Sequence, residues 1–283
     1  MTHQMVPVFA TGDASTAIRL LPGKAVLVSH AWLGSRFVPW DLLQILLDVA
    51  GEVTADCGAF TRWQRRLKGK CESCGIVTTA LGERICEKCK TKAPLFTLEL
   101  WAEFIECHHH RYRRFVAPDV IGDADASMAN WQQLLAMLPP RHRHRIMPVW
   151  HEGDPIEHLE EYDPSSRLVS IGRTKGRQTG ALGKKCTRLF YDEAFNRFPD
   201  GDFWALGNGT PETLEPYPFH YFDQTTWQRD SAYSQSHGYP WSAVSKDTRM
   251  RAYIEASETI TYRPVQPPKQ GAFEWARHEE AGA

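Results

Sequence analysis

Residues 204–227 read WALGNGTPETLEPYPFHYFDQTTW, and this stretch is the most direct indication of the fold. The apolar run 202–206 meets a Gly-Asn-Gly turn that begins at Gly207, and Thr-Pro-Glu then begins a short helix. A second apolar run, 218–222, ends on Asp223. A strand, a glycine turn, a helix and a strand that ends on a carboxylate are how a (β/α)8 barrel presents a catalytic acid at its carboxyl-terminal mouth. We therefore expect Asp223 to carry the chemistry.

Short apolar or β-branched runs alternate with helical stretches along the rest of the chain, which predicts parallel βα units. Seven or eight such units predict an α/β fold with a closed TIM-like (β/α)8 barrel. An open doubly wound sheet usually has a Gly-rich phosphate loop after its first strand, whereas Ser-His-Ala-Trp follows the first strand predicted here. The predicted strands are 25–29, 53–56, 115–120, 146–150, 168–171, 202–206 and 218–222, with a weak eighth near 241–244, and the predicted helices are 39–50, 97–107, 125–138 and 155–162.

The composition fits one large globular domain that covers residues 1–283, with a hydrophobic fraction of 42%. The polar end, 271–283, is expected to be a flexible tail. No apolar run approaches the roughly 18–20 residues of a membrane span, and the first residues lack a secretion signal. We therefore expect a cytoplasmic protein that does not contact the membrane.

The chain has 33 basic and 34 acidic residues, so its formal net charge is -1. A protein that coats DNA without sequence preference normally has a basic excess, so any contact with nucleic acid must come from local patches. Two such patches are HHHRYRR (108–114) and RHRHR (141–145). The alternative is that each forms a solvated helix or loop face.

Four of the seven cysteines have the spacing C-x2-C-x11-C-x2-C. In a cytosolic chain, two such pairs indicate a tetrahedral zinc site, with disulfides or free thiols as the alternative. No position is left open for water, so the expected Zn2+ is structural. We place this zinc-binding insertion at 68–93, after the second predicted strand. Its expected ligands are Cys71, Cys74, Cys86 and Cys89, whereas Cys57, Cys107 and Cys186 are expected to be small buried residues.

Three predicted strands end on an aspartate, at Asp56, Asp119 and Asp223. Two others end close to His151 and Gly172. In a barrel these ends converge on one mouth, where crowded carboxylates separate their pKa values. Such a pair suits substitution at a sugar anomeric carbon, with one carboxylate as nucleophile and another as acid/base. The alternative is that each aspartate caps the helix that follows its strand.

Five elements of the sequence resemble, in order, the core motifs of the tRNA-guanine transglycosylases. The likeness spans about residues 25–230 and is greatest to the DNA-acting relatives from phages and bacterial modification islands, which place 7-deazaguanines in DNA. The ending YPFHYFDQTTW looks particularly like that branch. The five elements are DCGAF (56–60), APDVIGD (117–123), VSIG (169–172), LGNGTPE (206–212) and FDQTTW (222–227).

The resemblance implies a role for each matching residue. Asp223 occupies the position of the family's nucleophile, and Asp56 that of its general acid/base. Asp119 matches the residue that hydrogen-bonds the Watson–Crick edge of the purine, and Gly172 the residue whose backbone approaches the base. Phe60 lies beside this pocket, where it flanks the base or packs in the core.

The chain also departs from the family pattern. Members that act on tRNA usually have a glutamine where this chain reads Trp-His-Glu, which puts the contact to the incoming base in doubt. We include His151 and Gly207 among the residues expected to contact substrate. The family's usual zinc site follows the nucleophile, yet no cysteine lies beyond Cys186. The insertion that follows Asp56 either grips the polynucleotide or only stabilises a long loop, and nearby charge comes from Arg62, Arg65, Arg66, Lys68 and Lys70.

Taken together, the resemblance implies a DNA-guanine transglycosylase, in the host cytoplasm if a phage encodes it. Its expected partners are DNA, with the target guanine flipped out or single-stranded, and a free 7-deazaguanine base such as preQ0. The alternatives are base exchange in tRNA and a zinc-bearing DNA-binding module without catalysis. The sequence leaves open the C7 substituent of the base, the DNA context, helper proteins, and whether the protein is a monomer or a homodimer.

Overall fold

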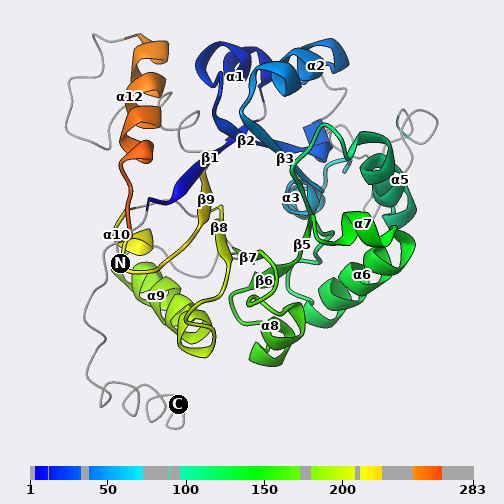
Figure 1. The fold of residues 1–283 in the computed structure, drawn as a ribbon, viewed down its shortest axis with the longest axis vertical. Helices are drawn as coiled ribbons and strands as arrows, with labels where there is room; N and C mark the ends of the chain where they lie inside the picture. The colour runs from blue at the N-terminus through cyan, green and yellow to red at the C-terminus, as the bar shows by residue number, and fades with distance from the viewer. Residues whose placement is uncertain are drawn as a thin grey trace.

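The computed structural model describes residues 4–11, 13–32, 38–72, 89, 96–172, 180–207, 211–224 and 245–262. Nine parallel strands form one sheet that curls into a nearly closed barrel with helices on its outside (Figure 1). The strands are β1 (Val6–Thr11), β2 (Ala25–Ser29), β3 (Glu52–Asp56), β4 (Arg114–Val116), β5 (Ile146–Met147), β6 (Val149–His151), β7 (Val169–Gly172), β8 (Phe203–Leu206) and β9 (Tyr221–Gln224). Their order in the sheet is β5-β4-β3-β2-β1-β9-β8-β7-β6.

The register of the strands matches a TIM-like barrel. Starting at Thr11, the paired residues lead through β2, β3 and β4 to Ile146 in β5. Three residues further along the same segment, Val149 leads through β7, β8 and β9 to Val6. The path starts at Thr11 and ends at Val6, five residues earlier in β1, although it moved three residues forward between Ile146 and Val149. The total stagger is therefore eight residues, which is the shear of a (β/α)8 barrel. The two edge strands, β5 and β6, are separated only by Pro148, which has no N–H to donate.

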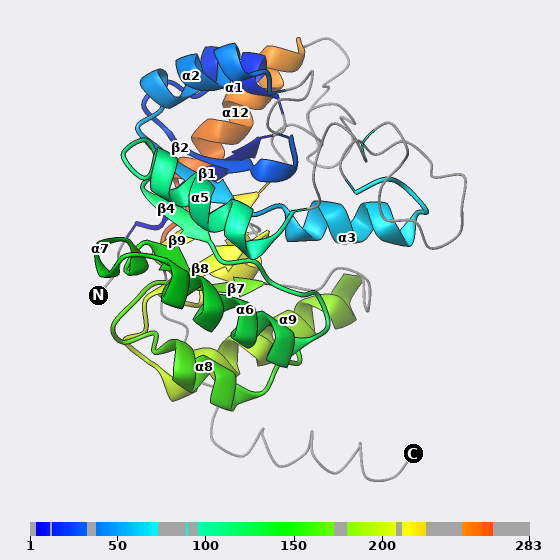
Figure 2. The ribbon, with the colours of Figure 1, turned by 90° about the vertical axis from the view of Figure 1, so that its right-hand side faces the viewer.

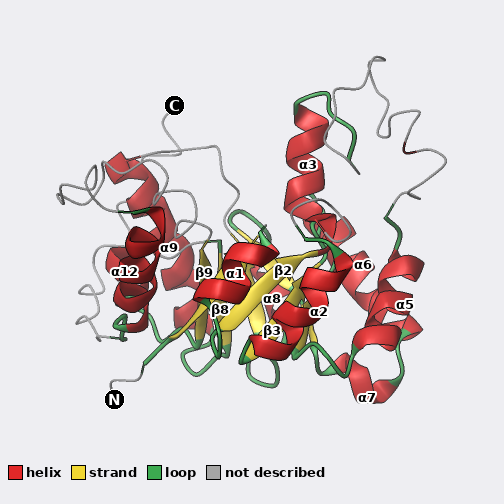
Figure 3. Cartoon of the chain, turned by 90° about the horizontal axis from the view of Figure 1, so that it is seen from above, coloured by secondary structure: helices red, strands yellow, loops and turns green. Residues whose placement is uncertain are grey.

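Most helices surround the sheet, whereas α3 extends away from it (Figures 2 and 3). Side-chain caps begin several of them, since Asp13, Thr97, Asp123 and Ser245 each accept a backbone N–H at the N-cap. The helices are α1 (Ala14–Leu20), η1 (His30–Trp32), α2 (Trp40–Val49), α3 (Ala59–Leu67), α5 (Leu98–His108), α6 (Ala124–Met137), α7 (Pro140–Arg143), α8 (Ile156–Tyr162), α9 (Gly180–Arg197), α10 (Pro211–Leu214) and α12 (Lys246–Glu258).

Alternate residues of each strand supply two apolar layers. The larger layer lies between sheet and helices and includes Phe9, Phe115, Trp150 and Phe222. The smaller layer fills the barrel interior; its buried members are Val8, Ala10, Leu27, Val116, Met147, Val149 and Trp204. Because side chains alternate between the two faces of a strand, this layer identifies which residues point inward near the mouth.

A polar group lies inside the barrel below the mouth. Arg114 forms an ion pair with Glu52, and its Nη2 donates to the Tyr221 hydroxyl at 2.7 Å. The Arg114 guanidinium also lies 4.4 Å from the centre of the Tyr221 ring, and that ring stacks on Trp204 with centroids 5.2 Å apart. These contacts extend from β3 across the interior to β8.

The structure confirms the predicted barrel-like α/β fold and corrects three details. Strand β1 was not predicted; it fills the position between β2 and β9. The segment 68–93 consequently follows the third strand, β3, and not the second. Strand β4 ends at Val116, so Asp119 lies in the loop beyond it and not in a strand that reaches residue 120.

Two predicted segments, the strand at 241–244 and the tail at 271–283, lie outside the described residues. Among the helices that are described, none is long and apolar enough to cross a membrane.

Candidate active site

Asp56 is the last residue of β3, and its side chain points into the barrel. Its register partner is Ser29, and two residues earlier Thr54 pairs with Leu27, which belongs to the interior layer. Gly58 follows in the left-handed region, with φ of 82°, and begins α3. A Cβ at Gly58 would lie 2.7 Å from the Cβ of Ala31, so only glycine fits this turn.

Burial raises the pKa of the Asp56 carboxyl above its ordinary value of 3.8, and the negative charge of Asp119 adds to the rise. A hydrogen bond from the Gly58 backbone and the positive charge of Arg62 oppose it. Asp119 is therefore close enough for its charge to act on Asp56. A carboxyl with a raised pKa is suited to hold a proton and to donate it.

Asp119 forms a buried ion pair with His151. Asp119 Oδ2 lies 3.0 Å from His151 Nε2, and the side chains are 10% and 5% exposed. His151 Nδ1 lies 3.5 Å from Asp154 Oδ2, and the same oxygen accepts the His151 backbone N–H at 2.8 Å. Burial alone would lower the pKa of His151, but the hydrogen bonds to Asp119 and Asp154 raise it to about 9. The imidazole is therefore charged at neutral pH.

Gly172 leaves the space in which the His151 ring lies. The two residues are register partners on β7 and β6. A Cβ at Gly172 would lie 2.9 Å from His151 Cδ2 and 2.9 Å from a methyl of Val149. The absence of a side chain at Gly172 thus directly positions His151.

Cys57 connects the two acids of this part of the mouth. It is fully buried, and its Sγ lies 3.7 Å from Asp119 Oδ1 and 3.6 Å from the Ala117 carbonyl oxygen. Burial raises the pKa of its thiol well above the ordinary value, followed by the charges of Asp56 and Asp119. Cys57 is therefore a neutral thiol that donates weakly, not a thiolate nucleophile.

Asp223 lies in β9 and is 3% exposed. Its Oδ1 accepts two hydrogen bonds, from Trp204 Nε1 at 2.9 Å and from the Gly207 backbone N–H at 2.9 Å. Gly207 has a φ of 69°, which favours glycine. Two N–H donors on one oxygen orient the carboxylate and compensate its charge.

Asp223 and Asp56 lie at about the same height on the barrel wall. Asp223 pairs with Val8, Val8 with Ala25 and Ala25 with Glu52, so three steps lead from β9 to β3. A stagger of eight residues over eight strand positions shifts the height along the barrel axis by about one residue for each strand crossed. The three crossings therefore place Asp223 at the height of a residue about three beyond Glu52, which is close to Asp56. Tyr221, two residues before Asp223, packs on the interior layer, so Asp223 also points inward.

Four of the predicted site residues thus belong to one connected group, in which the charge of Asp119 raises the pKa of Asp56, Asp119 pairs with His151, and His151 packs on Gly172. Asp223 and Gly207 form a second group on the β8–β9 side. Phe60 is half-buried on α3, with its ring centroid 5.7 Å from that of Trp63.

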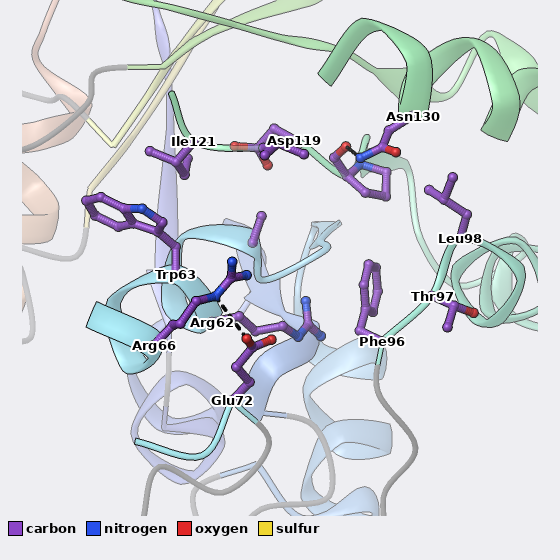
Figure 4. Close-up of a pocket in the computed structure, with 13 residues that line it drawn as sticks. Arg62, Trp63, Arg66, Glu72, Phe96, Thr97, Leu98, Asp119, Ile121 and Asn130 are labelled. Atoms are coloured by element: carbon purple, nitrogen blue, oxygen red, sulfur yellow. Dashed lines mark hydrogen bonds and ion pairs between the residues drawn. The ribbon is translucent and has the colours of Figure 1, made fainter. Parts of the chain in front are cut away.

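A cavity of about 450 Å³ opens beside this group, between α3 and the loop after β4 (Figure 4). Asp119 is the predicted site residue that lines it. Arg62 is fixed at its wall, because Arg62 donates to the Cys57 carbonyl oxygen, lies 3.2 Å from His30 Nδ1 and covers the Phe96 ring at 4.0 Å. His30 stays neutral because burial, and then the charge of Arg62, lower its pKa to about 4.

The expected zinc ligands are only partly within the described residues. Cys71 and Cys89 are both buried and pack against each other, although 17 residues separate them in the sequence. Cys74 and Cys86 lie outside the described residues, so the full ligand set is not tested. Two buried thiols brought together in this way fit half of a tetrahedral site.

The two basic patches of the sequence meet away from the mouth. The rings of His109 and His142 are 4.2 Å apart, and Arg145 donates to the His109 carbonyl oxygen. The patches lie at the amino-terminal ends of β4 and β5, and Arg114, the last residue of the first patch, is the first residue of β4 and lies inside the barrel. They do not contribute to the candidate active site.

Trp204 and Cys57 were not assigned functional contacts from the sequence. Trp204 lies two residues before the end of β8 and therefore faces the barrel interior, as Asp223 does. This alternation along the strand is the only sequence signal for a contact between the two side chains. Pairings such as Cys57 with Asp119 join loops 62 residues apart and leave no local pattern.

No protein-family model matches this chain, and a search of curated proteins finds no match.

Proposed function

We propose that this protein is a DNA-guanine transglycosylase that exchanges guanine in DNA for a 7-deazaguanine base through a covalent glycosyl-aspartate. The observation that supports the proposal most is the difference between two inward-facing acids at one mouth. Asp56 has a raised pKa, whereas Asp223 accepts two N–H donors on a single oxygen. Carboxyls with such different surroundings suit the two roles of a retaining substitution at an anomeric carbon.

In the first half-reaction, a carboxylate oxygen of Asp223 attacks C1′ of the target nucleotide, and the bond from C1′ to N9 of guanine breaks. The proton held by Asp56 passes to the departing base. Trp204 and Gly207 hold Asp223 in the orientation for attack. The ester between Asp223 and C1′ conserves the sugar until a second base enters.

In the second half-reaction, the incoming base gives its N9 proton to Asp56, and N9 attacks C1′. The ester bond to Asp223 breaks, and the carboxylate is restored. Two inversions leave the original configuration, which pairing in a duplex requires. Reaching C1′ in this way requires a flipped or single-stranded nucleotide.

Asp119 is the proposed acceptor for the Watson–Crick edge of the base. The guanine edge presents N–H donors, which an ionised carboxylate accepts. The charged imidazole of His151 compensates the buried carboxylate of Asp119 and holds it in place at 3.0 Å. His151 thus acts on the base through Asp119 in this proposal, and Gly172 acts by leaving room for His151.

We also propose that a structural Zn2+ is bound by Cys71, Cys74, Cys86 and Cys89. Such an ion would stabilise the insertion that follows α3, because a segment of this length has no core of its own. In the described part of that segment, the buried side chain of Glu72 forms an ion pair with Arg66 of α3 at 3.0 Å. Zinc binding at the neighbouring Cys71 would thereby stabilise α3.

The proposal is tested by incubating the protein with radiolabelled guanine and either single-stranded DNA, duplex DNA or unmodified tRNA. Label should enter DNA with the parent protein and not with Asp223→Asn, and the parent should form a protein–DNA adduct that survives denaturant. Mass spectrometry of nucleosides from DNA of cells that express the protein would identify the base. Label entering tRNA alone would favour the tRNA enzyme, and label in neither polymer would contradict exchange.

A further inference from the structure

The cavity beside the mouth contains chemistry that guanine exchange does not use. It has a volume of about 450 Å³, which falls within the range of small-ligand pockets. Figure 4 shows Arg62, Arg66 and Glu72 on one side, Asp119 and Asn130 opposite, Trp63 at one end, and Phe96 at the other. Cations, a large aromatic ring and amide groups together are typical of a site for a nucleotide.

The helix that forms one wall packs on the fold only near its start, through Ala59 and Arg62. No residue of α3 is buried, and the helix extends away from the barrel (Figure 3). Between Cys57 and Cys71 the sequence contains five cations and no acid, at Arg62, Arg65, Arg66, Lys68 and Lys70. A solvated basic helix beside a catalytic mouth attracts a phosphodiester backbone.

The two arginines of the cavity differ in how they are held. Arg62 is fixed by Cys57, His30 and Phe96, so it supplies positive charge from the wall. Arg66 uses its Nε to bind Glu72, and its side chain is 55% exposed. Its Nη atoms have no hydrogen-bond partner among the described residues and can reach a phosphate.

Stacking and edge recognition come from the other walls. Arg62 already covers the Phe96 ring, so the partly exposed indole of Trp63, which lines the cavity, is the aromatic surface available to a base. Asn130 Nδ2 donates to the Pro118 carbonyl oxygen at 3.1 Å, which fixes its amide with the oxygen available as an acceptor. Asp119 borders both this cavity and the acid group of the mouth, so the two sites are neighbours.

We infer that this cavity binds the nucleotide next to the exchanged one, with its base stacked on Trp63 and its phosphate on Arg66. The inference rests on the proposed function, because it assigns the cavity to the same single strand. It adds a second binding site, so that two successive bases leave the stack and not the target alone. Binding here would hold the target sugar above Asp223 and Asp56.

Equilibrium binding of a fluorescein-labelled 12-nucleotide single-stranded DNA, measured by anisotropy, tests the inference without requiring exchange. Trp63→Ala should weaken binding about tenfold or more, because one base–aromatic stack is lost. Arg66→Gln should weaken binding and reduce the slope of log K against log salt by about 0.7, the value for one phosphate contact on a single strand. Arg66→Lys, which keeps the charge, should keep the slope.

The chain offers matched controls. Arg19 has the same side-chain exposure as Arg66, 55%, and an ion pair with Asp247, so Arg19→Gln should leave both affinity and slope unchanged. Trp40 is 53% exposed on α2, and Trp40→Ala should likewise bind as the parent does. If Trp63→Ala and Arg66→Gln bind like these controls, the inference is wrong.

The same variants separate failure of this site from failure of the proposed function. If the parent is active and its Trp63 and Arg66 variants bind DNA and exchange guanine normally, the neighbouring-nucleotide site is wrong and the exchange reaction stands. If these variants bind DNA more weakly but the parent exchanges no guanine, the site stands and the exchange reaction is wrong. If the variants bind DNA normally and the parent shows no exchange, both the neighbouring-nucleotide site and the exchange reaction are wrong.

Discussion

The indole Nε1 of Trp204 donates a hydrogen bond to Oδ1 of Asp223 at 2.9 Å, and both side chains are buried. Trp204→Phe should remove this donor while a ring still stacks on Tyr221. A catalytic carboxylate that loses one of two orienting donors should exchange guanine about 10–100-fold more slowly, and the protein should lose about 1–3 kcal/mol of stability. Steady-state exchange rates and urea denaturation would measure the two effects.

Trp150→Phe is the matched control for this variant. Trp150 is also fully buried, and its Nε1 donates to the Pro155 carbonyl oxygen at 3.0 Å on the outer side of the barrel wall. Its loss of stability should be similar and its exchange rate normal. Equal exchange rates in the two variants would show that Trp204 only supports the fold.

Asp56→Asn should abolish proton transfer and yet stabilise the protein. Burial raises the pKa of Asp56 above 3.8, so the folded state binds its proton more tightly than the unfolded state. Ionisation above that pKa therefore destabilises the parent, and the neutral amide avoids this cost. We expect the melting temperature of Asp56→Asn to exceed that of the parent at pH 8 and the difference to shrink below pH 4. Exchange should fall by at least about 100-fold.

His151 should make the stability of the protein fall with rising pH in the alkaline range. Its folded pKa of about 9 exceeds the ordinary 6.5, so its contribution is fully present below pH 6.5 and is lost as pH rises through about 9. The free energy of unfolding of the parent should fall over this interval by on the order of 3 kcal/mol relative to His151→Gln. Asp119→Asn should remove most of the same slope, and a full slope in that variant would contradict the ion pair.

Gly172→Ala should displace His151 without changing any polar group. The added Cβ would meet His151 Cδ2 and a Val149 methyl at 2.9 Å, so the ring must move. We expect a lower exchange rate and, by NMR titration, a lower pKa of His151. Gly201→Ala is the control, since its Cβ would meet the Phe203 ring at 2.5 Å in the loop before β8. It should destabilise the protein with normal chemistry at the mouth.

Cys71→Ser should lower the zinc content from about one ion per chain and lower the melting temperature. Cys71 is buried against Cys89. Cys107 was expected to be buried, but it is exposed on α5, so Cys107→Ser should keep the metal. Atomic emission after dialysis would measure the zinc. Purified protein with no zinc, or equal zinc in both variants, would contradict the proposed site.

The sequence predicted most of the strands but not β1. The run Val6–Thr11 contains Pro7, which argues against a central strand. The structure tolerates Pro7 because pairing with β2 begins only at Val8, so the missing N–H faces no partner in that ladder. The position of the insertion was miscounted for the same reason.

The site was predictable where it depends on strand ends and not where it depends on side-chain contacts. Asp56 and Asp223 were found because alternation and strand length place them at the mouth. The pair formed by Asp119 and His151 joins two loop-proximal residues 32 apart, and no periodicity specifies it. A substrate contact of His151 stays a prediction; in the structure its Nε2 lies 3.0 Å from Asp119 Oδ2.

A single segment closes the barrel around Pro148. β5 and β6 are consecutive pieces of this segment: β5 pairs with β4, β6 pairs with β7, and the Pro148 carbonyl oxygen accepts the Ser170 backbone N–H at 2.9 Å. His151 ends the segment, and Asp119 follows β4, its neighbour in the sheet. The ion pair therefore fastens the closing segment to the loop after β4, and a local opening at Pro148 would part the two side chains and alter the mouth at the same moment.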